Sequence, residues 1–193
     1  GERSISTPKH YAYLKISEGC DHPCSFCAIP LIRGKYRSFS IEELIVEAGN
    51  LARKGVKELL IIGQDTTEYG IDIYGKRNIA ELLRKLSEIK GIEWIKLLYS
   101  YPSHFPEDLI DEIASNPKIC KYIDIPLQHI SDNILKSMRR GITGKRTKLL
   151  VEKIKKKIPG ITLRTTFITG YPGETKEDFE ELCKFVKETG FDR

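Results

Sequence analysis

Strand-like and helix-like segments alternate along the whole chain, and this alternation limits the possible folds more than any other feature. Apolar residues occupy every second position from Tyr11 to Ile16, and short apolar runs follow at 58–62, 94–99, 122–125 and 161–167. Apolar residues at helical spacing fill the stretches between these runs. The pattern predicts parallel βα units in an α/β fold, arranged as a barrel or as a doubly wound sheet.

Helices are expected at 41–52, 79–89, from Pro106 onward, from Ser131 to Met138, at 145–157 and at 176–189. Ser40 and Glu43 form a capping-box pattern before the first helix, and Gly190 ends the last one. Five βα units are fewer than the eight units and about 250 residues of a closed TIM barrel, so a partial, open barrel is expected. The chain lacks an initial Met and stops where another strand should begin. We therefore expect residues 1–193 to be a single domain cut from a longer protein.

Composition limits the class of protein. A hydrophobic content of 40% in 193 residues supports a buried core. Apolar runs such as 59–62 are too short to cross a membrane, and residues 1–4 have no signal-peptide core. We expect a cytoplasmic protein. The net charge of +5 is only a weak indication of a nucleic-acid partner.

Three cysteines, Cys20, Cys24 and Cys27, form the pattern CxxxCxxC directly after the first predicted strand. A 4Fe-4S cluster normally has four cysteine ligands, so three would leave one iron open to another ligand. The same cysteines could be part of a structural zinc site, with His22 or a distant cysteine as the fourth ligand. The spacing alone leaves both interpretations open.

The other cysteines are predicted to have structural roles. Cys183 lies on an apolar helical face with Phe179, Leu182 and Val186 and is expected in the core. Cys120 is expected to start a buried strand. His129 could either serve the site or pack beneath it.

Loops that follow the strands of a parallel βα fold gather at one end of the sheet. The cysteine loop follows the first predicted strand, and the segments 63–65, 100–104, 126–129 and 169–174 follow the other four. We expect all five loops to surround one mouth.

The CxxxCxxC motif, with Phe26 directly before its last cysteine, resembles the radical S-adenosylmethionine superfamily. This resemblance implies a partial (βα)6 barrel, a radical SAM core, in which S-adenosylmethionine chelates the open iron of a 4Fe-4S cluster. It further implies reductive cleavage to a 5′-deoxyadenosyl radical that abstracts hydrogen from the substrate. A side-chain general base is not required for that step, so no catalytic side chain is predicted.

The chain resembles the methylthiotransferases within this superfamily over nearly its whole length. The segments that carry the likeness are 27–30, 33–34, 63–70, 99–102, 124–129 and 167–175. Gly63-Gln64-Asp65 and Pro126-Leu127-Gln128-His129 are similar to the branch that methylthiolates the β-carbon of an aspartate in small-subunit ribosomal protein twelve. The tRNA branch, which modifies an adenosine, tends to have Gly-Gln-Asn and Pro-Val-Gln-Ser there. A zinc-stabilised nucleic-acid-binding module is the non-enzymatic alternative.

The resemblance assigns roles to particular residues. Cys20, Cys24 and Cys27 would ligate the cluster, and Phe26 would lie beside the adenine. The segment Gly63, Gln64 and Asp65 would receive the methionine amino group, with either Gln64 or Asp65 making the contact. Residues expected around the sulfonium and ribose are Ser100, Gln128, Arg164 and Ile168. Arg140 could bind a carboxylate at the mouth, and Glu174 departs from the superfamily pattern by one extra residue.

The resemblance also implies partners. The complete enzyme would carry an amino-terminal domain with a second 4Fe-4S cluster and a carboxyl-terminal TRAM-like domain, neither of which is in this chain. Its substrate would be the ribosomal protein or the ribosome, with tRNA only under the alternative. Flavodoxin or ferredoxin would donate electrons. We expect the chain alone to cleave S-adenosylmethionine without completing sulfur insertion.

Overall fold

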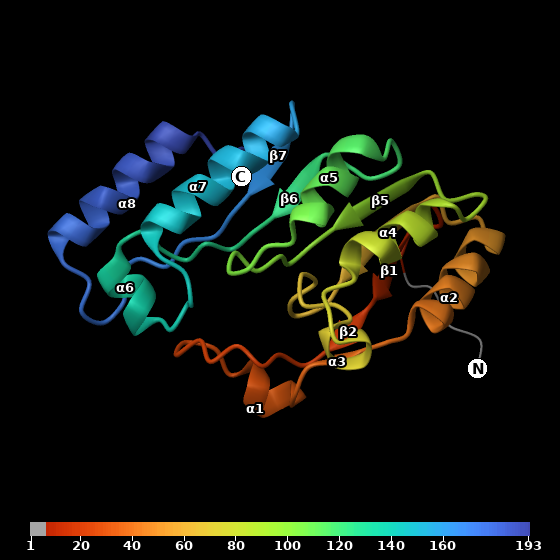
Figure 1. Ribbon diagram of the computed structural model, residues 1–193, viewed down its shortest axis with the longest axis horizontal. Coiled ribbons are helices and arrows are strands. Elements are labelled where there is room, and N and C mark those ends of the chain that lie inside the picture. Colours follow the sequence, from red (N-terminus) through yellow and green to blue (C-terminus); the bar gives the residue numbers. More distant parts are fainter. Residues whose placement is uncertain (1–6) are drawn as a thin grey trace.

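Five parallel strands form the centre of the computed structural model, which describes residues 7–193 (Figure 1). These strands are β1 (Tyr11–Lys15), β4 (Glu58–Ile62), β5 (Trp94–Leu97), β6 (Tyr122–Asp124) and β7 (Thr162–Arg164). β4 pairs with β1 and β5, and β6 pairs with β7. An Ile95–Ile119 bridge and a 2.8 Å bond from Ser100 N to Asp124 O join the two groups. The predicted open α/β barrel is confirmed.

Helices cover one face of this curved sheet, and the cysteine loop lies on the other side of the molecule (Figure 1). The longer helices are α2 (Ile41–Arg53), α4 (Ile79–Ser87), α5 (Glu107–Ser115), α7 (Gly144–Lys157) and α8 (Lys176–Thr189). Three short helices lie within connecting segments: α1 (Ile29–Arg33), α3 (Ile71–Tyr74) and α6 (Asp132–Ser137). None of the helices among residues 7–193 is both long and apolar enough to cross a membrane.

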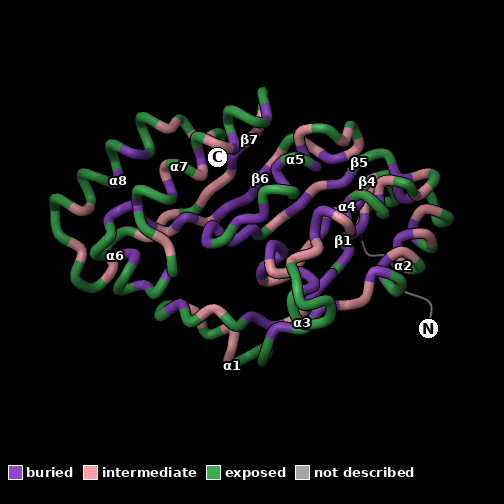
Figure 2. Tube along the Cα trace, viewed as in Figure 1, coloured by how far each residue is buried: buried purple, intermediate pink, exposed green. Residues whose placement is uncertain are grey.

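The core lies between the sheet and these helices, where Figure 2 shows the buried trace along the strands. Each parallel strand contributes at least one fully buried aliphatic side chain: Leu14, Leu59, Ile95, Ile123 and Leu163. Strand side chains alternate between the two faces, so their neighbours point into the barrel opening. The opening is lined by more polar and partly exposed residues, such as Lys15, Lys96 and Arg164. A polar opening is suited to ligands rather than to packing.

Capping residues mark the helix ends much as the sequence predicts. Ser40 accepts a hydrogen bond from the backbone N–H of Glu43, and the Glu43 carboxylate accepts one from the Ser40 N–H. Ser131 precedes α6 as expected, but its hydroxyl donates to Asp178 instead of capping the helix. Gly190 ends α8 with φ of 59°.

Two features differ from the sequence-based expectations. A small antiparallel pair, β2 (Ser17–Glu18) with β3 (Arg37–Ser38), closes the base of the cysteine loop. The prediction for Cys183 is wrong, because this residue is exposed. α8 buries Leu182 and Phe185, and the Phe185 ring packs edge-on against Phe167 and Phe191, so the buried face is rotated away from Cys183.

Cys120 and the last two residues of the chain lie close to strands β6 and β7. Cys120 is half-buried and lies two residues before β6, so it does not start this strand as expected. The backbone N–H of Asp192 donates to Leu163 O, and Thr165 N–H donates to Arg193 O, so residues 192–193 lie along β7. Residues 1–4, whose lack of a signal-peptide core was noted above, lie outside the described residues.

Removing a buried side chain from β4 is expected to destabilise the sheet. We expect Leu59→Ala to lower the free energy of unfolding by about 2–5 kcal/mol, because Leu59 is 0% exposed and the surrounding residues cannot fill the cavity completely. Urea unfolding measures this loss. The matched control is Leu149→Ala on α7, since Leu149 is 54% exposed and should change stability by less than about 0.5 kcal/mol. Equal losses in both variants would contradict the placement of Leu59.

Candidate metal and cofactor site

The cysteine loop is fixed at both its base and its centre. At the base, Cys20 N–H donates to Gly34 O at 3.2 Å, and Gly19 has φ of 80°, where a Cβ would collide with Lys35 O. At the centre, Ser25 N–H donates to Met138 O at 3.2 Å. The Ser25 hydroxyl donates to Ser137 O at 2.9 Å. The loop therefore runs from β1 across the opening to the end of α6.

Two of the three cysteines on this loop are buried. Cys20 and Cys24 are buried, and Cys27 is partly exposed. Burial raises the pKa of the Cys20 thiol to about 11, with nearby Asp65 adding to the effect. Metal ligation requires a thiolate, so a cation bound here would replace the thiol proton. A set of three thiols in a shielded loop is chemically a metal-ligand set.

A stack of three flat side chains lies beside Cys24. The His22 and Tyr101 rings are parallel, with centroids 3.7 Å apart. The Arg140 guanidinium lies 4.2 Å from the centroid of the Tyr101 ring. Arg140 Nη1 donates to Cys24 Sγ at 3.4 Å, and the Tyr101 hydroxyl lies 3.7 Å from the same sulfur. Arg140, which could bind a carboxylate at the mouth, is buried and donates to a cysteine sulfur in this structure.

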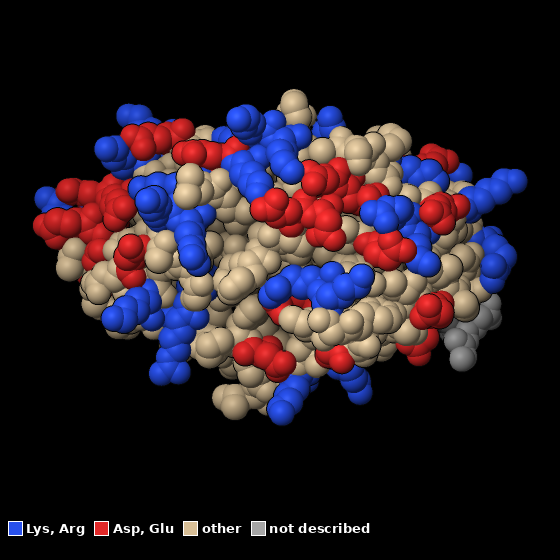
Figure 3. All heavy atoms as spheres, viewed as in Figure 1, with Lys and Arg blue, Asp and Glu red and all other residues tan. Residues whose placement is uncertain are grey.

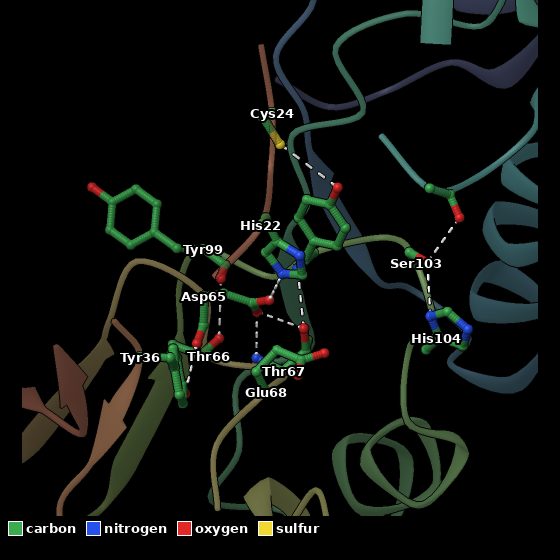
Figure 4. A network of polar contacts seen from close by, with 12 residues as sticks. His22, Cys24, Tyr36, Asp65, Thr66, Thr67, Glu68, Tyr99, Ser103 and His104 are labelled. Carbon is green, nitrogen blue, oxygen red and sulfur yellow. Dashed lines mark hydrogen bonds and ion pairs between the residues drawn. The ribbon is translucent and has the colours of Figure 1, made fainter. Parts of the chain in front are cut away.

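Asp65 has internal partners for both carboxylate oxygens (Figure 4). Its Oδ1 accepts from Thr67 N–H at 2.8 Å and from the Thr67 hydroxyl at 2.6 Å. Its Oδ2 lies 2.6 Å from His22 Nε2. Asp65 is 2% exposed, so these contacts hold the β4 loop against the cysteine loop. The sequence pattern indicates His22 only as a zinc ligand and gives no sign of its contact with Asp65.

Three predicted site residues present buried polar atoms without partners among residues 7–193. These atoms are Gln64 Oε1, Ser100 Oγ and Gln128 Oε1, which follow β4, β5 and β6. Native proteins rarely leave such atoms unsatisfied, and an absent ligand is one explanation. A cavity of about 360 Å³ lies beside the first of them, lined by Lys15, Ile29, Ile62, Gly63, Gln64 and Tyr99. Its volume falls in the range of small-molecule sites.

Gly63 has a steric role at this cavity. A Cβ on Gly63 would lie 2.5 Å from Ser17 Oγ in β2, so a larger residue would force this side chain to move. The glycine lets β4 approach β2 where the cavity begins.

The other residues predicted to contact the cofactor, Phe26, Arg164 and Ile168, lie around the opening in different local environments. Phe26 is 38% exposed on the cysteine loop. Arg164 Nη1 donates to Asp124 Oδ1 at 2.8 Å, an ion pair across β6 and β7. Ile168 N–H donates to Gln128 O at 2.8 Å, which joins the loops after those strands.

His129 packs beneath the last motif loop and not at the surface of the mouth. It is fully buried, and its Nδ1 accepts from Ser131 N–H at 3.1 Å. Its Nε2 lies 3.7 Å from Glu174 Oε1. The other Glu174 oxygen accepts from Tyr171 N–H at 3.0 Å. Glu174 therefore stabilises its own loop.

Strained backbone positions gather in the loops that follow the strands. Tyr99, His104 and Gln128 have φ of 59°, 55° and 72°, although none is a glycine. Such conformations are costly and tend to occur at functional sites. Nothing in the sequence indicated them.

The fold and these contacts define an open α/β barrel with three free cysteines on the loop after β1 and a cavity at the same end of its sheet. A family model described as "Radical SAM superfamily" matches residues 14–186. The chain belongs to this superfamily.

Curated relatives give a finer match. The whole chain is 61% identical to "Ribosomal protein uS12 methylthiotransferase RimO" of Flavobacterium johnsoniae and covers 44% of that protein. It is 58% identical to the protein of that name from Cytophaga hutchinsonii, again over 44% of its length. For Bacteroides thetaiotaomicron the identity is 55% over 192 residues and 44% of the protein. The chain thus spans less than half the length of these relatives.

Solved structures share the fold at low sequence identity. The methyltransferase TsrM from Kitasatospora setae superposes with a TM-score of 0.76 at 19% identity, over 98% of this chain and 39% of that one. The coproporphyrinogen III oxidase HemN from Escherichia coli gives 0.63 at 17% identity, over 95% and 42%. These likenesses confirm the radical SAM core fold.

The superfamily implies a 4Fe-4S cluster and S-adenosylmethionine, and the residues fit both. Two buried cysteines and the partly exposed Cys27 could supply thiolates for all but one iron of a cubane. The unpartnered atoms of Gln64, Ser100 and Gln128 could make polar contacts with a ligand beside it.

Proposed function

We propose that this chain is the radical-generating core of a methylthiotransferase that converts an aspartate of a small-subunit ribosomal protein to 3-methylthioaspartate. One observation carries the proposal: the chain aligns over its whole length with bacterial proteins named ribosomal protein uS12 methylthiotransferase. An aspartate β-carbon has no proton that an ordinary base removes at neutral pH, which is consistent with radical chemistry. When bound, the cluster and S-adenosylmethionine would supply the electron and the hydrogen-abstracting radical.

The side chains of this core would bind, orient and shield. Cys20, Cys24 and Cys27 would hold the cluster. Gln64 is a better candidate than Asp65 for the methionine amino group, because Asp65 already has partners at both oxygens and Gln64 Oε1 has none among the described residues. No side chain is required to move a proton at the reacting carbon.

Further contacts to S-adenosylmethionine are proposed at the rim. Ser100 and Gln128 would contact the ribose or sulfonium, supported by their unpartnered buried oxygens. Phe26 would lie beside the adenine, and Ile168 would lie near the sulfonium and ribose. Arg164 would take part only through a rearrangement of its ion pair with Asp124.

Sulfur insertion would need parts beyond this core. We propose that residues 1–193 form one domain of a longer cytoplasmic enzyme, with a second 4Fe-4S cluster in an amino-terminal domain and a TRAM-like domain for docking. Flavodoxin or ferredoxin would reduce the cluster. The relatives' greater length is consistent with such domains.

Mass spectrometry of ribosomal protein and tRNA from a deletion strain tests the substrate. We expect the ribosomal protein to lose one methylthio group and tRNA to keep its methylthio groups. Re-expression of the complete gene provides the control and should restore the modification. Loss from tRNA alone would favour the tRNA branch and contradict the proposal.

Anaerobic reconstitution tests the chemistry of the core. We expect the purified chain to take up iron and sulfide and to cleave S-adenosylmethionine when reduced, without forming methylthio product. Stoichiometric zinc without sulfide would contradict the radical function. Methylthio product from the chain alone would contradict the need for other domains.

A further inference from the structure

Arg140 is a buried cation without a carboxylate partner. Arg140 is 4% exposed, and among residues 7–193 its guanidinium donates to Cys24 Sγ and to Pro126 O and forms no ion pair with a carboxylate. Burial of an unpaired charge is strongly unfavourable, so such a group normally has a counterion. Its Nη1 donates to Cys24 Sγ at 3.4 Å. Arg140 therefore places its positive charge directly beside the Cys24 sulfur.

The guanidinium is held firmly in this orientation. Nη2 donates to Pro126 O at 2.6 Å, in the loop after β6. The Tyr101 ring lies 4.2 Å below the guanidinium, and the Tyr101 hydroxyl donates to Arg140 O at 2.8 Å. His22 supports the opposite face of that ring. A planar group that is stacked and hydrogen-bonded loses little freedom when it donates to sulfur, which a lysine could not match.

Hydrogen bonds to cluster sulfurs and nearby charge set the potential of an iron–sulfur cluster. Reduction adds one negative charge to the cluster. A fixed cation that donates to a ligand sulfur stabilises the reduced form more than the oxidised form, because the attraction grows with the added charge. The low polarity of a buried site strengthens this effect.

We propose that Arg140 is a positioning residue that raises the reduction potential of the cluster by donating an N–H···S hydrogen bond to Cys24 and placing a fixed positive charge beside it. This inference rests on the part of the proposed function that places a 4Fe-4S cluster on the three cysteines. Arg140 acts through Cys24, so it need not touch the substrate.

The test compares Arg140→Met with Arg139→Met in the anaerobically reconstituted chain. Arg139 is the adjacent residue and is exposed, so both variants lose one positive charge but only one loses the sulfur contact. Redox titration followed by electron paramagnetic resonance measures the fraction of reduced cluster. At a fixed solution potential we expect about tenfold less reduced cluster for Arg140→Met than for Arg139→Met, which corresponds to a midpoint lower by about 59 mV.

A conservative variant keeps the test decisive if Arg140→Met fails to hold a cluster. Arg140→Lys retains the charge but not the planar donor, and we expect its midpoint to lie below that of Arg139→Lys by a smaller amount. Equal midpoints in whichever matched pair holds the cluster would overturn the inference while leaving the proposed function intact. Zinc without sulfide in the parent chain would instead contradict both.

Discussion

Cys24→Ala should abolish the iron–sulfur cluster. We expect iron and sulfide contents close to zero after anaerobic reconstitution, because a cluster left with two protein thiolates loses most of its attachment and Cys24 is the buried ligand beside Arg140. Cleavage of S-adenosylmethionine should be lost with the cluster. Iron and sulfide analysis and the visible absorption spectrum measure the result.

The matched control for this prediction is Cys183→Ala. Cys183 is exposed on α8, so its removal should leave iron and sulfide contents unchanged. Parent-like cluster content in Cys24→Ala, or equal losses in both variants, would show that the cluster is not held by the loop after β1.

Gln64→Leu and Asp65→Leu should separate ligand binding from folding at two adjacent positions. We expect Asp65→Leu to lower the free energy of unfolding by about 3 kcal/mol, because it leaves two buried donors of Thr67 without an acceptor and removes the partner of the partly buried His22. Urea unfolding of the metal-free chain measures this loss. Gln64→Leu removes an oxygen without a partner in the described residues, so it should change stability by less than about 0.5 kcal/mol.

For the affinity for S-adenosylmethionine we expect the opposite order, with the larger effect in Gln64→Leu. We expect Gln64→Leu to raise the dissociation constant of S-adenosylmethionine about tenfold, as the loss of about 1.4 kcal/mol of hydrogen-bond energy would do. Equilibrium dialysis with reconstituted protein measures it. Unchanged affinity in Gln64→Leu, together with weakened binding in a folded Asp65→Leu, would assign the contact to Asp65.

Most of the fold could be predicted because its signals are local. The limits of β4 and α8 agree with the predicted ranges 58–62 and 176–189, since apolar periodicity and capping residues act within a few positions. Predicted strands at 94–99 and 161–167 were too long. The chain leaves the ladder early there, and Tyr99 adopts a positive φ that no local signal reveals.

The site was predictable only in part. The cysteines and the strand-end motifs are visible as residue types at fixed spacing. The contacts of Cys24 with Tyr101 and Arg140 join positions 77 and 116 residues apart, so no sequence window contains them. The error at Cys183 has a related cause: α8 offers two overlapping apolar faces, and the packing of Phe185 against Phe167 decides between them.

The attachment of the cysteine loop has a mechanical consequence for the barrel. The loop starts from β1 at one edge of the sheet, and Ser25 is bound to Ser137 and Met138 near the other edge. The loop therefore links the two edges of the open barrel, and a cluster on its three cysteines would make this link more rigid. Because such a cluster binds the folded chain and not the unfolded one, its loss would loosen the two sides of the opening together.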